Sequence, residues 1–149
     1  MMQAVIMAGG KGTRLAALTK DEIPKPMVPV AGKPLLLWQV ERLKENGITD
    51  IIMVIGHLGD KIKEYFGDGE KFGVSIRYFE ETEPLGTAGS FYYLKNMIHG
   101  DRFVMMSGDL FFDIDFQRMI HFHEEKGAVA TLFVHPNGHP FDSDLLVLD

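Results

Sequence analysis

The sequence predicts an α/β fold in which a mostly parallel sheet is covered by helices. Short apolar runs of strand length recur along the chain, and helix-length segments stand between them. Glycines mark several of the changes from one kind of segment to the other. Parallel strands must be joined by a long crossover, which is usually a helix, so this alternation favours a parallel sheet over an antiparallel one.

The clearest strand–helix–strand unit lies in the first part of the chain. Residues 3–8 form a short apolar run that Gly9 and Gly10 interrupt, which predicts a buried strand followed by a loop. Residues 35–46 carry apolar side chains at helical spacing and are followed by a glycine. Residues 50–55 are again continuously apolar after the first position, and we expect a second buried strand there.

The same alternation continues to the end of the chain. In order, we expect a helix over 60–66, a strand over 75–79, a helix over about 87–97, a strand over 102–106, a helix over 116–126 and strands over 129–134 and 144–149. Because the last strand has no covering element after it, we expect a chain truncated at its C-terminus. With no repeat or linker visible, we expect one domain over residues 1–149.

Composition and charge exclude several classes of function. The 149 residues include 15 basic and 21 acidic side chains, and the net charge of −6 argues against nonspecific binding to nucleic acid or to an anionic membrane. The chain has no cysteine, so disulfides, thiolate metal sites and cysteine nucleophiles are excluded. No apolar stretch is long enough for a membrane span and no export signal is visible, so we expect a cytoplasmic protein.

A glycine-rich loop follows the first predicted strand, where an open α/β sheet places its ligand crevice. Glycines let the backbone amides approach phosphate oxygens, and Lys11 and Arg14 add positive charge at the same place. Residues 1–33 hold five basic and two acidic side chains, although the chain as a whole is acidic. The loop is therefore typical of a polyphosphate site, although a flexible turn with solvated charges stays open as the simpler interpretation.

Two common phosphate motifs do not fit this loop. A Walker loop needs Ser or Thr after its Gly-Lys pair, where Gly12 stands. The dinucleotide-binding fingerprint needs a third glycine where Leu15 stands. Neither an ATPase nor a dehydrogenase is favoured.

Four separated motifs carry a resemblance to a known family. The runs MAGGKGTRL over 7–15, PKPM over 24–27 with GKP over 32–34, EPLGTAG over 83–89 and SGD over 107–109 resemble those of the sugar-1-phosphate nucleotidyltransferases in order and spacing. The resemblance implies a Rossmann-like three-layer α/β/α fold of the nucleotide-diphospho-sugar transferase type. The chain would be its NTP-binding domain, incomplete at the C-terminus.

The resemblance also implies a reaction, in which a sugar 1-phosphate attacks the α-phosphorus of a nucleoside triphosphate to give an NDP-sugar and pyrophosphate. A phosphate monoester has a second pKa of about 6, so the nucleophile is already ionised at neutral pH and no general base is needed. By motif position, Lys25 would bridge the α-phosphate and the sugar phosphate. The residues expected to hold the triphosphate are Ala8, Gly9, Gly10, Lys11, Gly12, Thr13 and Arg14, with Arg14, Lys25 and Asp109 as the catalytic set.

Asp109 is the candidate ligand for Mg²⁺. It follows the apolar run 103–106, which places its carboxylate at the carboxyl end of a strand and facing the crevice. Mg²⁺ prefers one or two carboxylates together with substrate phosphates, although a turn aspartate is the simpler alternative. The family takes a second metal ligand from a later strand, and no matching position precedes Asp149. We therefore expect this chain alone to be catalytically incomplete.

By the same resemblance, residues 80–89 line the nucleobase pocket. Guanine presents adjacent N–H donors that one carboxylate can accept, whereas uracil and thymine present one, so Glu81 favours GTP. The sequence of residues 83–89 is similar to that of mannose-1-phosphate and heptose-1-phosphate guanylyltransferases. Residues 139–144 are similar to the heptose type over a short match. The sugar and any homo-oligomer are left open. The base-side candidates are Glu81, Pro84, Gly86 and Thr87.

Other motifs supply alternatives. Asp113 and Asp115 fit the Asp-X-Asp pattern of glycosyltransferases that use an NDP-sugar, but they stand just before a predicted helix, so we favour a helix N-cap. A non-catalytic nucleotide-sensing module is the third alternative. The histidines at 121 and 123 lie on different helix faces, so we expect no zinc site. We expect Trp38 in the core and residues 91–94 against the sheet.

Overall fold

The computed structural model describes residues 2–10, 22–83 and 85–136. The chain forms two compact units, Met1–Ile114 and Asp115–Asp149, which are described separately below. The single domain expected over residues 1–149 stays a prediction. None of the helices in the described ranges is long and apolar enough to cross a bilayer.

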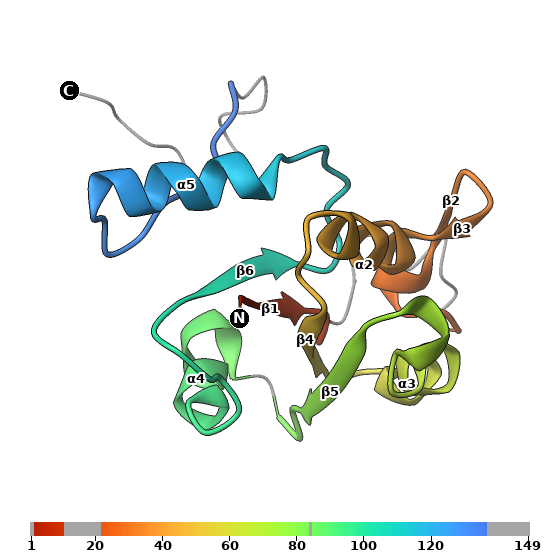
Figure 1. The fold of residues 1–149 in the computed structure, drawn as a ribbon. Coiled ribbons are helices and arrows are strands. Elements are labelled where there is room, and N and C mark those ends of the chain that lie inside the picture. Colours follow the sequence, from red (N-terminus) through yellow and green to blue (C-terminus); the bar gives the residue numbers. More distant parts are fainter. Residues whose placement is uncertain (1, 11–21, 84, 137–149) are drawn as a thin grey trace. The chain divides into compact units, whose positions relative to one another are not determined.

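The first unit is built on a four-stranded parallel sheet (Figure 1). Its strands are β1 (Gln3–Met7), β4 (Asp50–Ile55), β5 (Ser75–Glu80) and β6 (Phe103–Ser107), in the spatial order β5-β4-β1-β6. All three neighbouring pairs are parallel, as the sequence predicts. Strand β1 therefore lies between β4 and β6, with a hydrogen-bonded partner on each side.

The register aligns the ends of these strands. At the start of β1, Gln3 is opposite Asp50 and Phe103, and at its end Met7 is opposite Val54 and Ser107. The chain segments that leave the carboxyl ends of β1, β4 and β6 therefore begin side by side. This is the edge at which open α/β sheets bind ligands.

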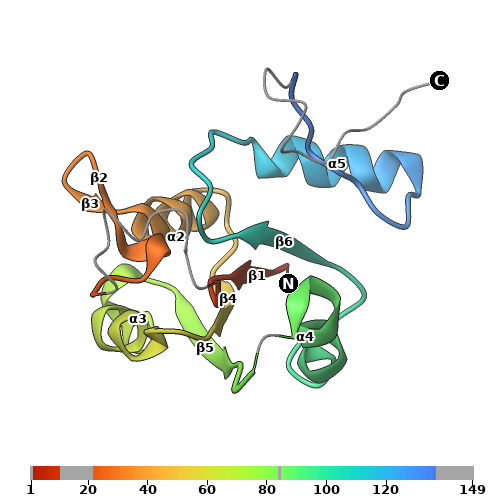
Figure 2. The same cartoon turned by 180° about the vertical axis from the view of Figure 1, so that it is seen from behind.

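Helices cover both faces of the sheet. Helices α2 (Leu35–Glu45) and α3 (Gly59–Phe66) lie on one face, and α4 (Gly86–Leu94) lies on the other (Figures 1 and 2). The chain runs outward from β1 to β5 and then returns past β1 to β6. Because crossovers between parallel strands are right-handed, this reversal sends α4, which joins β5 to β6, to the opposite face. The predicted three-layer α/β/α arrangement is confirmed.

The core is apolar because alternate side chains of each strand face opposite layers. On the α4 side, Val5, Ile52 and Val54 pack with Leu94, and all four are fully buried. Tyr92 is 67% exposed, so the expected cover of the sheet by residues 91–94 is wrong for this side chain. Helix α4 also ends three residues before the predicted boundary, because the carbonyl of Leu94 accepts from Met97 and Ile98 in a tight turn.

Short elements between β1 and α2 were not predicted. The 3-10 helix η2 spans Lys25–Met27, and β2 (Pro29–Val30) pairs antiparallel with β3 (Lys33–Pro34). The two residues of the turn, Ala31 and Gly32, have φ of 49° and 88°, as a tight primed hairpin turn requires. Elements of two or three residues are too short to produce a periodic pattern in the sequence.

The second unit contains α5 (Phe116–Lys126). The carboxylate of Asp115 accepts a hydrogen bond of 2.9 Å from the backbone N–H of Arg118, so the predicted N-cap is confirmed. The predicted strand over 129–134 is wrong, since these residues have no regular secondary structure. An apolar run becomes a strand only by pairing, and the described residues of this unit offer it no extended partner. The strand expected over 144–149 lies outside the described residues.

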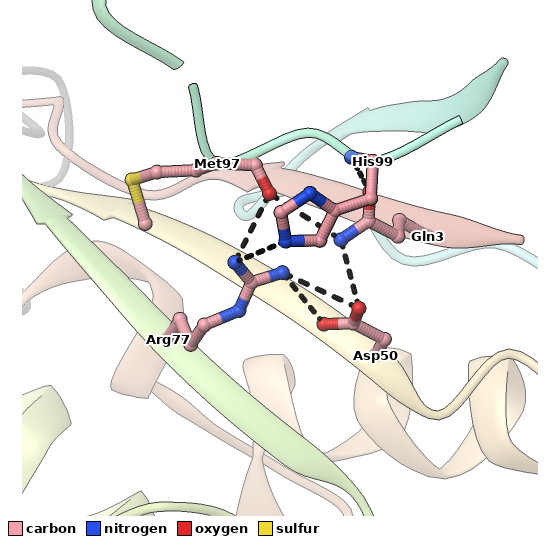
Figure 3. Close-up of polar contacts among 5 residues, drawn as sticks. All are labelled: Gln3, Asp50, Arg77, Met97 and His99. Atoms are coloured by element: carbon pink, nitrogen blue, oxygen red, sulfur yellow. Dashed lines mark hydrogen bonds and ion pairs between the residues drawn. The ribbon is translucent and has the colours of Figure 1, made fainter. Parts of the chain in front are cut away.

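A polar cluster ties the amino ends of the strands together (Figure 3). Asp50 accepts hydrogen bonds from Gln3 (2.8 Å) and from the guanidinium of Arg77 (3.0 and 3.3 Å). Arg77 also donates to the carbonyl of Met97, and the carboxamide oxygen of Gln3 accepts from the backbone N–H of His99. The turn that follows α4 is therefore fastened to β1 and β5, and Asp50 of β4 joins the two side chains that hold it.

Removal of the carboxylate from this cluster should destabilise the fold. In Asp50→Ala, the buried Gln3 and the partly buried Arg77 each lose a partner, and we expect the free energy of unfolding to fall by about 2 kcal/mol. Glu45→Ala is the matched control, because Glu45 only pairs with Arg42 on the exposed side of α2; it should change stability by less than about 0.5 kcal/mol. Urea unfolding measures both changes, and an equal effect of the two substitutions would contradict this role.

Candidate active site

Glycines bring the backbones together at the carboxyl edge of the sheet. Gly9, Gly56 and Gly108 follow β1, β4 and β6. A Cβ on Gly56 would stand 2.8 Å from the carbonyl oxygen of Gly9, and one on Gly108 would stand 3.1 Å from the Cβ of Ala8. Both distances are shorter than ordinary carbon contacts, so side chains at these positions would push the strand ends apart. The glycines keep the three loops in contact.

Lys25 and Asp109 meet at this edge. Lys25 begins η2, and Asp109 follows β6 by two residues, so the two positions are 84 residues apart in the sequence. The Nζ of Lys25 donates to Oδ2 of Asp109 in an ion pair, and the hydroxyl of Ser107 donates to Oδ1 at 2.6 Å. Both side chains are about one third exposed, at 28% and 32%, so a ligand can reach them. Ser107 belongs to the motif at 107–109, but no role was predicted for it.

The surroundings of Asp109 favour its ionised form. Partial burial opposes ionisation, but the hydrogen bonds from Lys25 and Ser107 and the charge of Lys25 outweigh it, and the pKa of Asp109 is lowered below its ordinary value. The carboxylate is therefore an anion at neutral pH. This is the state that a divalent cation requires.

Asp109 fits one position of a Mg²⁺ site. Mg²⁺ takes oxygen ligands, keeps several waters and is usually held by one or two carboxylates with substrate phosphates. Within the part of the chain that is described, no three acidic or histidine side chains gather into a metal-binding group. A site that uses Asp109 would therefore take fewer than three such side chains from the described residues, which suits a cation shared with a bound phosphate chain.

Glu81 lies against the glycine that follows β1. Its backbone N–H donates to the carbonyl of Ile55 at 2.8 Å, which fixes the residue beside the end of β4. One carboxylate oxygen accepts from the hydroxyl of Ser90, and the other lies 2.6 Å from the place where a Cβ of Gly9 would stand. The carboxylate thus fills the space of the missing side chain. The structure brings the predicted base-side motif and the glycine-rich motif together.

Ser90 is a site residue that sequence reasoning missed. It lies in α4, is fully buried, and its hydroxyl is within hydrogen-bonding distance of Glu81 and of the carbonyl of Gly86 at 3.0 Å. A hydroxyl has one proton, and an ionised carboxylate is the stronger acceptor. The signal in the sequence was a serine directly before the aromatic residues of the predicted helix, and no partner was predicted for it.

The remaining candidates divide into three groups. Ala8 is 2% exposed and its N–H donates to the carbonyl of Val54, so that N–H is not available to a ligand. Gly10 is exposed, and Gly86 and Thr87 form the first turn of α4. The candidates outside the described residues are Lys11, Gly12, Thr13, Arg14 and Pro84.

The Asp-X-Asp pattern has structural partners. Asp115 caps α5, and Asp113 pairs with Arg42 on α2. Both carboxylates are therefore engaged by protein groups. The pattern that suggested a glycosyltransferase is accounted for by the fold.

Comparisons with known proteins find relatives of this chain. The model of the nucleotidyl transferase family matches residues 3–142. A D-glycero-alpha-D-manno-heptose 1-phosphate guanylyltransferase of Campylobacter jejuni is 44% identical over 129 residues, covering 87% of this chain and 57% of that protein. A UTP–glucose-1-phosphate uridylyltransferase of Synechocystis is 39% identical over 142 residues, covering 88% of this chain and 36% of that protein.

A solved structure shares the fold. The crystal structure of HddC from Yersinia pseudotuberculosis complexed with GMP-PN has a TM-score of 0.73 and 33% sequence identity, covering 83% of this chain and 54% of that one. The chain belongs to the nucleotidyl transferase family. It spans between 36% and 57% of the length of the three relatives named here.

The contact between the glycines predicts an asymmetric effect of two alanine substitutions. Gly56→Ala places a Cβ against the backbone of Gly9, which can shift only at a cost in free energy. The substitution should therefore destabilise the protein by about 1–3 kcal/mol. A Cβ on Gly10 would meet no atom of the described residues within 4 Å, so Gly10→Ala should change stability by less than about 0.5 kcal/mol. Thermal unfolding of the two variants tests this difference. Equal melting temperatures would show that the close contact is not needed.

Proposed function

We propose that residues 1–149 are the NTP-binding domain of a sugar-1-phosphate nucleotidyltransferase, which transfers GMP from GTP to a sugar 1-phosphate and releases pyrophosphate. The observation that carries this proposal is the meeting of Lys25 and Asp109 at the carboxyl edge of the sheet. Their motifs are far apart in the sequence, and the reaction requires a cation and a metal-binding carboxylate at one place. Family membership supports the class of reaction.

The chemistry needs alignment and charge neutralisation more than proton transfer. An oxygen of the sugar phosphate forms a bond to the α-phosphorus of GTP, and the bond from that phosphorus to the pyrophosphate oxygen breaks. Lys25 would turn from Asp109 to the phosphates and offset their charge. Lys11 and Arg14 would hold the triphosphate with the backbone N–H groups of the glycine-rich loop. Asp109 would hold Mg²⁺, which when bound would supply further positive charge to the phosphate chain.

The base preference rests on Glu81. Its carboxylate is held by Ser90 and lies beside Gly9, at the edge where the glycine-rich loop begins. A carboxylate can accept two adjacent N–H groups of guanine, whereas uracil or thymine offers it one. The relatives named above include both a guanylyltransferase and a uridylyltransferase, so the support for GTP is this carboxylate together with the HddC complex. We place the reaction in the cytoplasm, without a nucleic-acid or membrane partner.

A nucleotide panel tests the proposal. The protein expressed from its complete reading frame is incubated with Mg²⁺, mannose 1-phosphate or heptose 1-phosphate, and each of GTP, UTP, dTTP and ATP in turn. We expect pyrophosphate release to be fastest with GTP. Binding of GTP without release would instead support the nucleotide-sensing module, and release only with UTP or dTTP would refute the assigned base.

Glu81→Gln should reduce the discrimination between bases. The amide keeps the size of the side chain but replaces one acceptor oxygen with a donor, so kcat/KM for GTP relative to UTP should fall by about tenfold or more, as expected for one lost bond to a charged group. Glu80→Gln is the control, because Glu80 is exposed and pairs with Lys63. An unchanged GTP preference in Glu81→Gln would remove this residue from base recognition.

Asp109→Asn should abolish the response to Mg²⁺ while leaving the fold intact. An amide keeps the shape of the side chain but loses the charge that a divalent cation needs, so we expect pyrophosphate release to fall by about 100-fold or more. Circular dichroism and the melting temperature should stay near those of the unmodified protein. A variant that keeps its Mg²⁺ dependence would show that the cation binds elsewhere.

A further inference from the structure

A buried glutamine of α2 clamps the loop that carries Asp109. Gln39 is 2% exposed, and its amide nitrogen donates to the carbonyl of Ser107 at 3.0 Å and to that of Leu110 at 2.6 Å. These carbonyls lie on either side of Asp109 in the sequence. Both N–H groups of the amide are therefore used to fix the backbone that bears the carboxylate.

Packing alone does not account for an amide at this position. The side-chain oxygen of Gln39 is buried, and no hydrogen-bond partner for it exists among the described residues. A buried acceptor without a donor destabilises a fold, whereas methionine has a similar shape and no such oxygen. What the glutamine provides, and methionine cannot, is the pair of donor bonds to the Asp109 loop.

The neighbours of Gln39 on α2 contact the same loop. The ring of Trp38 meets that of Phe111 edge-on with centroids 5.9 Å apart, and Arg42 pairs with Asp113. Helix α2 is also joined to the segment that carries Lys25, since the N–H of Leu35 donates to the carbonyl of Val28 at 3.0 Å. One helix thus supports both halves of the Lys25–Asp109 pair.

We propose that Gln39 is a positioning residue for metal-dependent catalysis. It holds the backbone on both sides of Asp109, so that the carboxylate keeps its place when Lys25 turns to the phosphates. The residue does not touch substrate or metal itself. This inference rests on the proposed function, because it assigns a role in presenting Asp109 to Mg²⁺.

Gln39→Met tests the clamp in the protein expressed from its complete reading frame. We expect hydrogen exchange at residues 107–111 to become about tenfold faster, including the N–H of Gly108, which donates to the carbonyl of Met7 at 2.8 Å. The Mg²⁺ concentration for half-maximal pyrophosphate release should rise by about three- to tenfold. The KM for GTP should stay within about twofold, because the clamp does not bear on the nucleotide directly.

Lys44→Met is the matched control. Lys44 is also on α2 and donates to a backbone carbonyl, that of Phe72 at 2.9 Å, but this carbonyl belongs to the 3-10 helix Glu70–Phe72. The control loses the same kind of bond without touching the Asp109 loop. In Lys44→Met, hydrogen exchange at residues 107–111 and the Mg²⁺ dependence of pyrophosphate release should match those of the unmodified protein.

The outcomes separate this inference from the proposed function. Unchanged exchange at 107–111 in Gln39→Met, or faster exchange with an unchanged Mg²⁺ dependence, would overturn the positioning role. If Gln39→Met does not unfold cooperatively, Gln39→Leu takes its place, and failure of both variants to fold would show a purely structural role. An unmodified protein that releases no pyrophosphate refutes the proposed function, while the exchange measurement still tests the clamp.

Discussion

Strand β1 and its two parallel neighbours impose the constraint on which the rest of the first unit depends. Because β1 is hydrogen-bonded on one side to β4 and on the other to β6, in register, the segments that leave these strands start at one edge. Gly9, Gly56 and Gly108 let those segments touch. Any shift of one strand along another would separate the loops and the residues that they present.

Two pairs of side chains at this edge are arranged in the same way. In the first pair, Lys25 lies in η2 and Asp109 follows β6. In the second pair, Glu81 follows β5 and Ser90 lies in α4. In each case a charged side chain is held by a partner from another element. Carboxylates that are fixed before a ligand arrives lose little freedom when they bind it. The polar cluster around Asp50 plays the corresponding structural role at the opposite ends of the strands.

The sequence was informative where physical patterns are long. The runs at 3–8 and 50–55 and the stripe at 35–46 predicted their elements within one residue, because a central strand is recognised by a continuous apolar run and a half-buried helix by apolar side chains at helical spacing. The meeting of Lys25 with Asp109 was implied only through the family resemblance. The contacts of Ser90 and Gln39 could not be predicted, because the sequence does not indicate which group a buried polar side chain will bond to. The apolar run at 129–134 was wrongly predicted to be a strand, because an apolar segment forms a strand only when another strand pairs with it.

The ion pair between Lys25 and Asp109 has a thermodynamic consequence for ligand binding. A polyanion that attracts the ammonium group leaves the carboxylate without its counter-charge, and a cation that attracts the carboxylate frees the ammonium group. Each ligand thereby removes the competitor of the other, so their affinities must rise together and by the same factor. Under the proposed function, nucleotide and metal would replace the two partners of this ion pair, and the binding of each would favour the binding of the other.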